Sequence, residues 1–280
     1  MINYKLSAFS DEYADSFEDQ LIALNRFEIG YTEVRYLDRK NVSLLTEEEV
    51  KLYKKKLDYY GISVSAIGSP LGKIKLDGNL EEHFEAARRV FNTANIFGTK
   101  FVRIFSFYAP DGEKIVNLKQ RAFSELERLL RISEEQGIVL CIENEAMVYG
   151  DTPKRCREII DHFDGKIKCV FDMGNYVLEG IDPYDEGYNL LKNDIAYFHV
   201  KDALSEGAIV PPGKGEARIK EIISAHMCFS EESFFVSLEP HLETFSGLNA
   251  LVGRSFKNPY KYPDKESAFA DAVDKFRALI

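Results

Sequence analysis

The chain has 280 residues, of which 45% are hydrophobic and 29% are charged, and this balance is typical of a folded globular protein rather than a disordered or fibrous one. A chain of this length buries roughly three quarters of the surface that its unfolded form exposes, so it needs no disulfide or structural metal to fold. Its 36 basic and 46 acidic side chains give a net charge of −10. This charge disfavours nucleic acid or anionic lipid as a partner, because phosphate binding depends on clustered Lys and Arg.

The sequence shows no feature of a secreted or membrane protein. No apolar stretch approaches the roughly 20 residues that would span a bilayer, and the N-terminus lacks the basic and apolar regions of a signal peptide. The cysteines form no Cys-x-x-Cys pair and have no histidine at zinc-binding spacing, which predicts reduced thiols; they are Cys141, Cys156, Cys169 and Cys228. We therefore expect a cytoplasmic protein.

Short apolar or alternating segments recur along the whole chain and are followed by amphipathic segments with helical period. The short segments predict eight strands, which begin near Tyr4, Tyr31, Ile62, Lys100, Ile138, Lys168, Ile195 and Phe234. The clearest predicted helices are 17–27, 46–60, 79–97 and 118–136. Thr46 is a candidate N-cap, and three glycines stand where helix C-caps are expected: Gly61, Gly98 and Gly137.

Eight consecutive strand–helix units predict an α/β fold, a single (β/α)8 TIM barrel that spans residues 1–280. The main alternative, a doubly wound open sheet, is expected to carry a glycine-rich phosphate-binding turn after its first strand. Here the first strand leads instead into Phe9-Ser10-Asp11-Glu12. A long loop at 245–262 precedes the last helix, and its length predicts that it covers the barrel mouth or packs on a neighbouring subunit of a homo-oligomer.

Four of the predicted strands end in side chains that commonly bind metals: Glu143, Asp172, His199 and Glu239. In a barrel of this kind the carboxyl ends of the strands meet at one mouth, where the active site lies. Three carboxylates and one imidazole suit Mn²⁺, Mg²⁺ or Co²⁺ and tolerate Zn²⁺. One residue from each of four consecutive strands therefore predicts one divalent metal ion at the mouth.

Two metal-free alternatives fit the sequence less well. A carboxylate pair of the barrel-glycosidase type could use Glu143 and Glu239 as acid and base, but it leaves Asp172 and His199 unexplained, and the chain has no Trp to stack on a sugar. A Schiff-base aldolase needs a lysine that points into the barrel. Lys201 has the same parity as His199, but it is expected to lie beyond the end of its strand.

Several of these segments resemble the xylose-isomerase-like barrels of sugar isomerases and epimerases. The resemblance lies in Ile142-Glu143-Asn144, Phe171-Asp172-Met173-Gly174-Asn175, Phe198-His199-Val200-Lys201-Asp202, Pro212-Gly213-Lys214-Gly215-Glu216 and Leu238-Glu239-Pro240-His241. That group includes ketose 3-epimerases, hydroxypyruvate isomerase, inosose dehydratases and a distant branch of apurinic endonucleases. The resemblance implies that the four strand-end residues are the metal ligands, and that Glu143 and Glu239 are also the acid/base pair.

The activity implied by the resemblance is that of a metal-dependent isomerase or epimerase of a small sugar or sugar derivative. A divalent ion that holds a carbonyl and a neighbouring hydroxyl stabilises the enediolate formed when a proton leaves the carbon between them. Two carboxylates then remove and return that proton. The alternatives are an inosose-type dehydratase and a non-catalytic sugar-binding or endonuclease-related barrel. The endonuclease branch needs several more histidines than the five in this chain.

Further polar residues are candidates for substrate binding. Asn175 stands where epimerases of the group usually carry a histidine, so it can hydrogen-bond a substrate but cannot titrate. Arg35 and Arg103 could bind an anionic group of the substrate or form an ion pair with Glu33. The remaining candidates near the mouth are Lys201, Lys214 and His241. The other three histidines lie in predicted helices and are expected at the surface or in packing positions: His83, His162 and His226.

Overall fold

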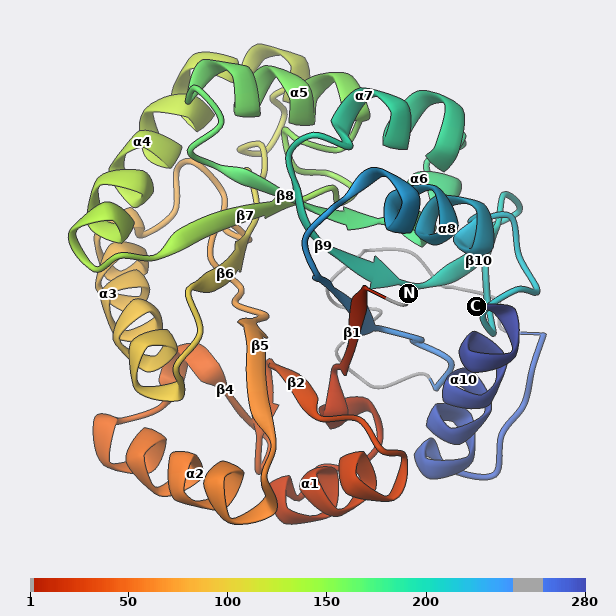
Figure 1. Ribbon diagram of the computed structural model, residues 1–280. Coiled ribbons are helices and arrows are strands. Elements are labelled where there is room, and N and C mark those ends of the chain that lie inside the picture. Colours follow the sequence, from red (N-terminus) through yellow and green to blue (C-terminus); the bar gives the residue numbers. More distant parts are fainter. Residues whose placement is uncertain (1–2, 244–258) are drawn as a thin grey trace.

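The computed structural model describes residues 3–243 and 259–280, and in them eight parallel strands form a nearly closed barrel surrounded by helices (Figure 1). The strand order is β1-β12-β9-β8-β7-β6-β5-β2. The barrel strands are β1 (Tyr4–Ala8), β2 (Tyr31–Val34), β5 (Ser63–Ile67), β6 (Phe101–Ile104), β7 (Val139–Glu143), β8 (Lys168–Asp172), β9 (Ile195–Val200) and β12 (Phe234–Leu238). This order confirms the predicted (β/α)8 barrel.

The first and last strands of that order, β1 and β2, lie side by side and complete the ring (Figure 1). The Thr32 hydroxyl donates a hydrogen bond to the Ala8 carbonyl oxygen at 3.2 Å and lies 3.0 Å from the Ser10 hydroxyl. Two short hairpins stand outside the barrel sheet, β3 (Tyr36–Leu37) with β4 (Lys40–Asn41) and β10 (Asp202–Leu204) with β11 (Ala208–Val210).

The helices alternate with the barrel strands and form the outer layer (Figure 1). They are α1 (Phe17–Arg26), α2 (Glu47–Tyr60), α3 (Leu80–Phe97), α4 (Lys119–Glu135), α5 (Pro153–His162), α6 (Met173–Leu178), α7 (Asn189–Leu191), α8 (Ile219–Phe229) and α10 (Lys265–Leu279). The predicted caps are confirmed at α2, where Thr46 and Glu49 form a reciprocal capping box and Gly61 is left-handed with φ 67°. Gly98 caps α3 in the same conformation.

The two faces of the barrel strands are buried in different ways. Leu140 and Ile142 belong to the large apolar core between the strands and the helices. Cys141 instead packs inside the barrel with Val170 and Tyr197. Because side chains alternate along a strand, Glu143 lies on the same inner side as Cys141, as the sequence predicts.

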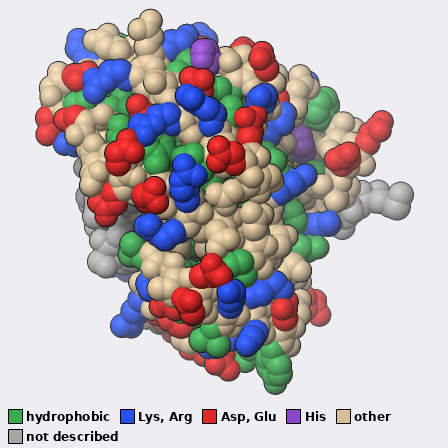
Figure 2. All heavy atoms as spheres, turned by 90° about the vertical axis from the view of Figure 1, so that its left-hand side faces the viewer, with side chains coloured by type: hydrophobic (Ala, Val, Ile, Leu, Met, Phe, Trp, Pro, Cys, Tyr) green, Lys and Arg blue, Asp and Glu red, His purple; other side chains and the backbone are tan. Residues whose placement is uncertain are grey.

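All four cysteines are free thiols, of which only Cys228 is exposed. Basic and acidic side chains are interspersed over the face shown in Figure 2. Among the described helices, none combines the length and the apolarity that crossing a bilayer requires.

The predicted loop at 245–262 lies mostly outside the described residues, so its role as a cover or subunit contact stays a prediction.

The helix histidines pack as expected, and two of them are held neutral. Burial lowers the pKa of both His83 and His226 to about 4. The His83 Nε2 accepts a hydrogen bond from the Gly72 amide at 2.9 Å, and His226 Nδ1 lies 3.3 Å from the Tyr188 hydroxyl. His162 packs against the ring of Phe123 instead.

Acid is therefore expected to destabilise the fold through these two histidines. An unfolded histidine has a pKa near 6.5, so between about pH 6.5 and pH 4 the unfolded state binds more protons and the free energy of unfolding falls as the pH falls. The loss amounts to at most about 3 kcal/mol per histidine. Urea unfolding at pH 7.0 and 4.5 measures it. The His226→Gln variant should lose less stability than the wild type over this interval, and equal losses would contradict the assignment.

Candidate metal centre

The four predicted metal ligands converge at the carboxyl ends of β7, β8, β9 and β12. The His199 Nδ1 atom lies 3.1 Å from Glu143 Oε1, 3.3 Å from Glu239 Oε2 and 4.0 Å from Asp172 Oδ2. All four residues are buried, and one ligand atom from each lies within 4.8 Å of the others. Three carboxylate oxygens and an imidazole nitrogen at such separations form a donor set that fits a hard divalent ion.

The second nitrogen of the imidazole is held by a carboxylate that sequence analysis did not place at the site. His199 Nε2 lies 3.0 Å from Glu33 Oε2, and the Tyr197 hydroxyl donates to Glu33 Oε1 at 3.0 Å. An outer carboxylate of this kind orients a ligating imidazole and raises its basicity. Glu33 thus fixes the ring so that Nδ1 faces the carboxylates of Glu143, Asp172 and Glu239.

The protonation of His199 reflects its acidic surroundings. Burial acts to lower the pKa of the imidazole, but the carboxylates of Glu33, Glu143 and Glu239 outweigh burial and raise the pKa well above its usual value. Both ring nitrogens lie beside carboxylate oxygens, which favours the protonated form of the ring. A metal ion that binds Nδ1 must displace a proton.

Asp172 serves both the fold and the cluster. Its Oδ1 accepts a hydrogen bond from the Asn175 amide at 2.8 Å and so caps α6, while Oδ2 faces His199. Asn144 fixes the same strand end, because its Nδ2 donates to the Asp172 carbonyl and its Oδ1 accepts from the Asp172 amide. The helix-capping role, which is the common one for a carboxylate at a strand end, therefore leaves one Asp172 oxygen that could bind a metal ion.

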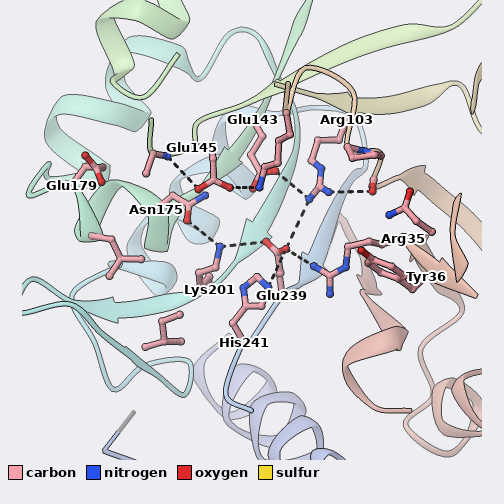
Figure 3. Close-up of a pocket in the computed structure, with 17 residues that line it drawn as sticks. Arg35, Tyr36, Arg103, Glu143, Glu145, Asn175, Glu179, Lys201, Glu239 and His241 are labelled. Carbon is pink, nitrogen blue, oxygen red and sulfur yellow. Dashed lines mark hydrogen bonds and ion pairs between the residues drawn. The ribbon is translucent and has the colours of Figure 1, made fainter. Parts of the chain in front are cut away.

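Three cations compensate the charge of the cluster (Figure 3). Arg103 Nη1 lies 3.1 Å from Glu143 Oε2, Arg35 Nη1 lies 3.0 Å from Glu239 Oε1, and Lys201 Nζ lies 2.8 Å from Asp172 Oδ2. Figure 3 shows that Arg35 and Lys201 approach Glu239 from opposite sides. Buried carboxylates of this density are stable only when such partners surround them.

The cations set the charge state of both glutamates. Burial acts to raise the pKa of Glu143, but Arg103 and His199 lower it to about 2. The pKa of Glu239 is also well below its usual value, because the positive charges of Lys201 and His199 outweigh burial. Both side chains are therefore carboxylates at neutral pH and can act as metal ligands and as proton acceptors.

Arg35 connects the cluster to the end of the first strand. Its Nε donates to Asp11 Oδ2 at 2.9 Å and its Nη2 to Glu12 Oε1 at 3.3 Å. Of the two alternatives for Arg35, the ion pair with Glu33 is not formed, because Glu33 lies beside His199 and Arg35 binds the two acidic residues after β1. Glu12, Glu239 and His241 form a second group of potential ligands. The guanidinium of Arg35 already bridges two of them, which disfavours a metal ion there.

The predicted substrate contacts mostly line one cavity at the barrel mouth. It is bounded by Glu143 and Glu239 together with Arg35, Arg103, Asn175, Lys201 and His241 (Figure 3). Lys73 and Glu145, which form an ion pair of 2.7 Å, also line it and were not predicted. Lys214 is exposed and does not contribute to the lining.

The family to which this fold and site belong follows from comparison with known proteins. The profile of the xylose isomerase-like TIM barrel family matches residues 25–226. The chain belongs to that family. No curated protein matches this xylose isomerase-like barrel.

Solved structures share the fold at low sequence identity. The probable 3-DHS dehydratase AsbF from Bacillus anthracis is 17% identical with a TM-score of 0.73, over 99% of this chain and 98% of that one. The IOLI protein with a bound zinc atom is 16% identical with a TM-score of 0.74, over 98% and 97%. The D-allulose 3-epimerase from Methylomonas sp. is 12% identical with a TM-score of 0.75, over 99% and 98%.

One loop of this xylose isomerase-like barrel is held by a buried carboxylate. Asp202, two residues after the end of β9, accepts hydrogen bonds from the amides of Gly213 at 2.7 Å, Gly215 at 2.9 Å and Ala217 at 3.0 Å. Three backbone amides of the loop from 211 to 217 therefore bind the carboxylate of Asp202. A Cβ atom at Gly215 would overlap both Asp202 Oδ1 and the Ala203 carbonyl oxygen.

Gly215→Ala is expected to destabilise the protein by about 1–3 kcal/mol, because the added methyl group has no room beside Asp202 and backbone atoms. The midpoint and slope of urea unfolding measure the loss. Gly30→Ala is the matched control, since a Cβ atom at Gly30 would meet no atom within 4 Å. If both variants are equally stable, the close packing of the loop on Asp202 is not important for the fold.

Proposed function

We propose that the protein is a divalent-metal-dependent isomerase or epimerase of a small sugar or sugar derivative. The observation that carries the proposal is the convergence of Glu143, Asp172, His199 and Glu239 in a buried cluster beside a cavity whose lining includes several charged side chains. The family membership supports it. So do solved structures with the same fold, which include a D-allulose 3-epimerase and an IOLI protein with a bound zinc atom.

The proposed metal ligands are Glu143 Oε1, Asp172 Oδ2, His199 Nδ1 and Glu239 Oε2. When bound, an ion such as Mn²⁺, Mg²⁺ or Co²⁺, with Zn²⁺ as a further candidate, polarises a carbonyl and a neighbouring hydroxyl of the substrate. The remaining oxygens of the two glutamates are held by guanidinium groups, Glu143 Oε2 by Arg103 and Glu239 Oε1 by Arg35. These contacts keep both side chains deprotonated and fixed in orientation.

The two glutamates are proposed as the proton-transfer pair. β7 and β12 are separated in the barrel by β8 and β9, so Glu143 and Glu239 reach the cluster from different sides. A carboxylate on each side of an enediolate can remove a proton and return it to the opposite face or to the adjacent carbon. Epimerisation or isomerisation follows from which carbon receives the proton.

The proposed substrate contacts are five polar residues of the cavity lining. They are Arg35, Arg103, Asn175, Lys201 and His241. Lys214 is left out, because it is exposed and away from the lining. The substrate is a small carbohydrate, and we propose that the protein acts in the cytoplasm, where its four thiols stay reduced.

A second candidate is a dehydratase of the inosose type. Asn175, which cannot titrate, stands where the related epimerases usually carry a histidine, and a neighbour of the same fold is a probable 3-DHS dehydratase. The same enediolate can expel a hydroxyl from the neighbouring carbon instead of taking a proton. The residues that would form the enediolate are identical in both candidates.

The test is a panel of ketoses and cyclitol ketones incubated with metal-loaded protein in D₂O and followed by NMR. Deuterium at carbon together with a new stereoisomer or aldose identifies an isomerase or epimerase. Loss of water with formation of a conjugated ketone identifies the dehydratase. Saturable binding by calorimetry without turnover of any compound would identify a non-catalytic binding protein and contradict both.

A further inference from the structure

The ammonium group of Lys201 binds the same carboxylate oxygens that the proposed metal ion needs. Its Nζ atom lies 2.8 Å from Asp172 Oδ2 and 3.4 Å from Glu239 Oε2. These two oxygens are the ones that face His199 Nδ1. We infer that Lys201 competes with the divalent ion for the cluster and thereby sets its metal affinity, an inference that rests on the proposed function.

Neither Asp172 nor Glu239 has a second carboxylate oxygen available for the metal ion. Asp172 Oδ1 accepts the hydrogen bond that caps α6, from the Asn175 amide at 2.8 Å. Glu239 Oε1 is held by Arg35 at 3.0 Å. The lysine and the metal ion must therefore share Asp172 Oδ2 and Glu239 Oε2, or one of the two cations must move away from these oxygens.

Lys201 has little freedom to move away from these oxygens. It is 5% exposed, and the Asn175 Oδ1 atom accepts a hydrogen bond from its Nζ at 3.0 Å. Asn175 is in turn fixed by donating its Nδ2 to the Asn144 carbonyl at 2.9 Å. The stem of the lysine packs so closely on Gly174 that a Cβ atom there would lie 2.9 Å from both Lys201 Cβ and Cγ.

The energetic consequence has two parts. In the absence of metal the ammonium compensates buried carboxylates that would otherwise be costly to desolvate, so the metal-free fold is stable. A doubly charged ion held by Asp172 Oδ2 and Glu239 Oε2 would share these buried oxygens with the ammonium group, and like charges repel strongly in surroundings shielded from water. Lys201 therefore stabilises the empty cluster and weakens metal binding.

The other cations of the cavity do not compete in this way. Arg103 contacts Glu143 Oε2, whereas the oxygen of that residue nearest His199 Nδ1 is Oε1. Lys73 lines the same cavity, but its partner is Glu145 at 2.7 Å, which is not one of the four ligands. Lys73 is thus a matched control of the same residue type.

The experiment measures Mn²⁺ binding by calorimetry to chelator-treated protein, with circular dichroism and thermal unfolding of each metal-free variant. Lys201→Met should bind Mn²⁺ about tenfold or more tightly than the wild type, the scale on which groups around the ligands change metal affinity. It should also unfold at a lower temperature without metal. Lys201→Arg, which keeps the charge, and Lys73→Met should bind Mn²⁺ as the wild type does.

Lys201→Gln is measured in parallel, so that the result does not depend on the folding of one variant. Unchanged or weaker Mn²⁺ binding by both neutral variants would overturn the inference and leave the metal centre standing. An equal increase in Mn²⁺ affinity in Lys73→Met would also overturn the inference, because the loss of any positive charge from the cavity would then have the same effect. Absence of Mn²⁺ binding in the wild type and in every variant would overturn the metal centre itself.

Discussion

Replacing Glu239 with glutamine is expected to lower kcat by about 10²–10⁴-fold, the usual contribution of a general acid or base. The amide still offers an oxygen to a metal ion, but it cannot accept and return a proton. KM should change much less than kcat, because the cavity keeps its shape and its other polar groups. Steady-state kinetics on the substrate found in the NMR panel gives both constants.

Glu145→Gln is the control for this loss. Glu145 lines the same cavity, but it pairs with Lys73 and lies outside the group of four ligands. Its variant should keep most of the turnover. If Glu239→Gln keeps its turnover, or if an active wild type incorporates no solvent deuterium at any carbon, proton transfer by the glutamates is wrong.

The convergence of Glu143, Asp172, His199 and Glu239 could be predicted because it depends on topology more than on local detail. Each of its four residues lies at or near the carboxyl end of a barrel strand, and parallel strands bring those ends to the same mouth. The parity of Glu143 with Cys141 fixed which side it faces. The neighbours of Glu143, Leu140 and Ile142, pack against the helices as the alternation requires.

The partners of the ligands could not be predicted in the same way. The pairing of β2 with β5 shifts its register between Thr32 and Glu33, and such an irregularity breaks the alternation on which a parity argument depends. Glu33 therefore meets His199, and Arg35 lies past the strand end beside Asp11 and Glu12. The acidic pair directly after the first strand was the sequence signal for that contact.

Lys201 shows a second limit of sequence reasoning. It lies just beyond β9, as expected. Its side chain is nevertheless buried beside Asp172 and Glu239 and does not extend into solvent at the barrel mouth. This burial depends on a residue of another element, since Gly174 at the start of α6 has no side chain and so leaves room for the methylene groups of Lys201. A contact between residues from two different strand–helix units depends on tertiary packing, which no local pattern contains.

Removing two of the four ligands in the double variant Glu143→Ala plus Asp172→Ala is expected to abolish stoichiometric metal binding. Protein purified without chelator should contain about one divalent ion per chain, and the double variant almost none, because two ligands cannot hold such an ion against water. Elemental analysis measures the content directly. Circular dichroism must show that the variant is folded, since Arg103 and Lys201 lose their buried partners.

Glu12→Gln distinguishes the proposed centre from the neighbouring group formed by Glu12, Glu239 and His241. Because Arg35 already bridges Glu12 and Glu239, this group should not hold the ion, and Glu12→Gln should keep about one metal per chain. A metal content that survives the double variant but falls in Glu12→Gln would move the centre to the second group. It would also remove Glu143 from the ligands and leave the proton-transfer scheme with Glu239 alone.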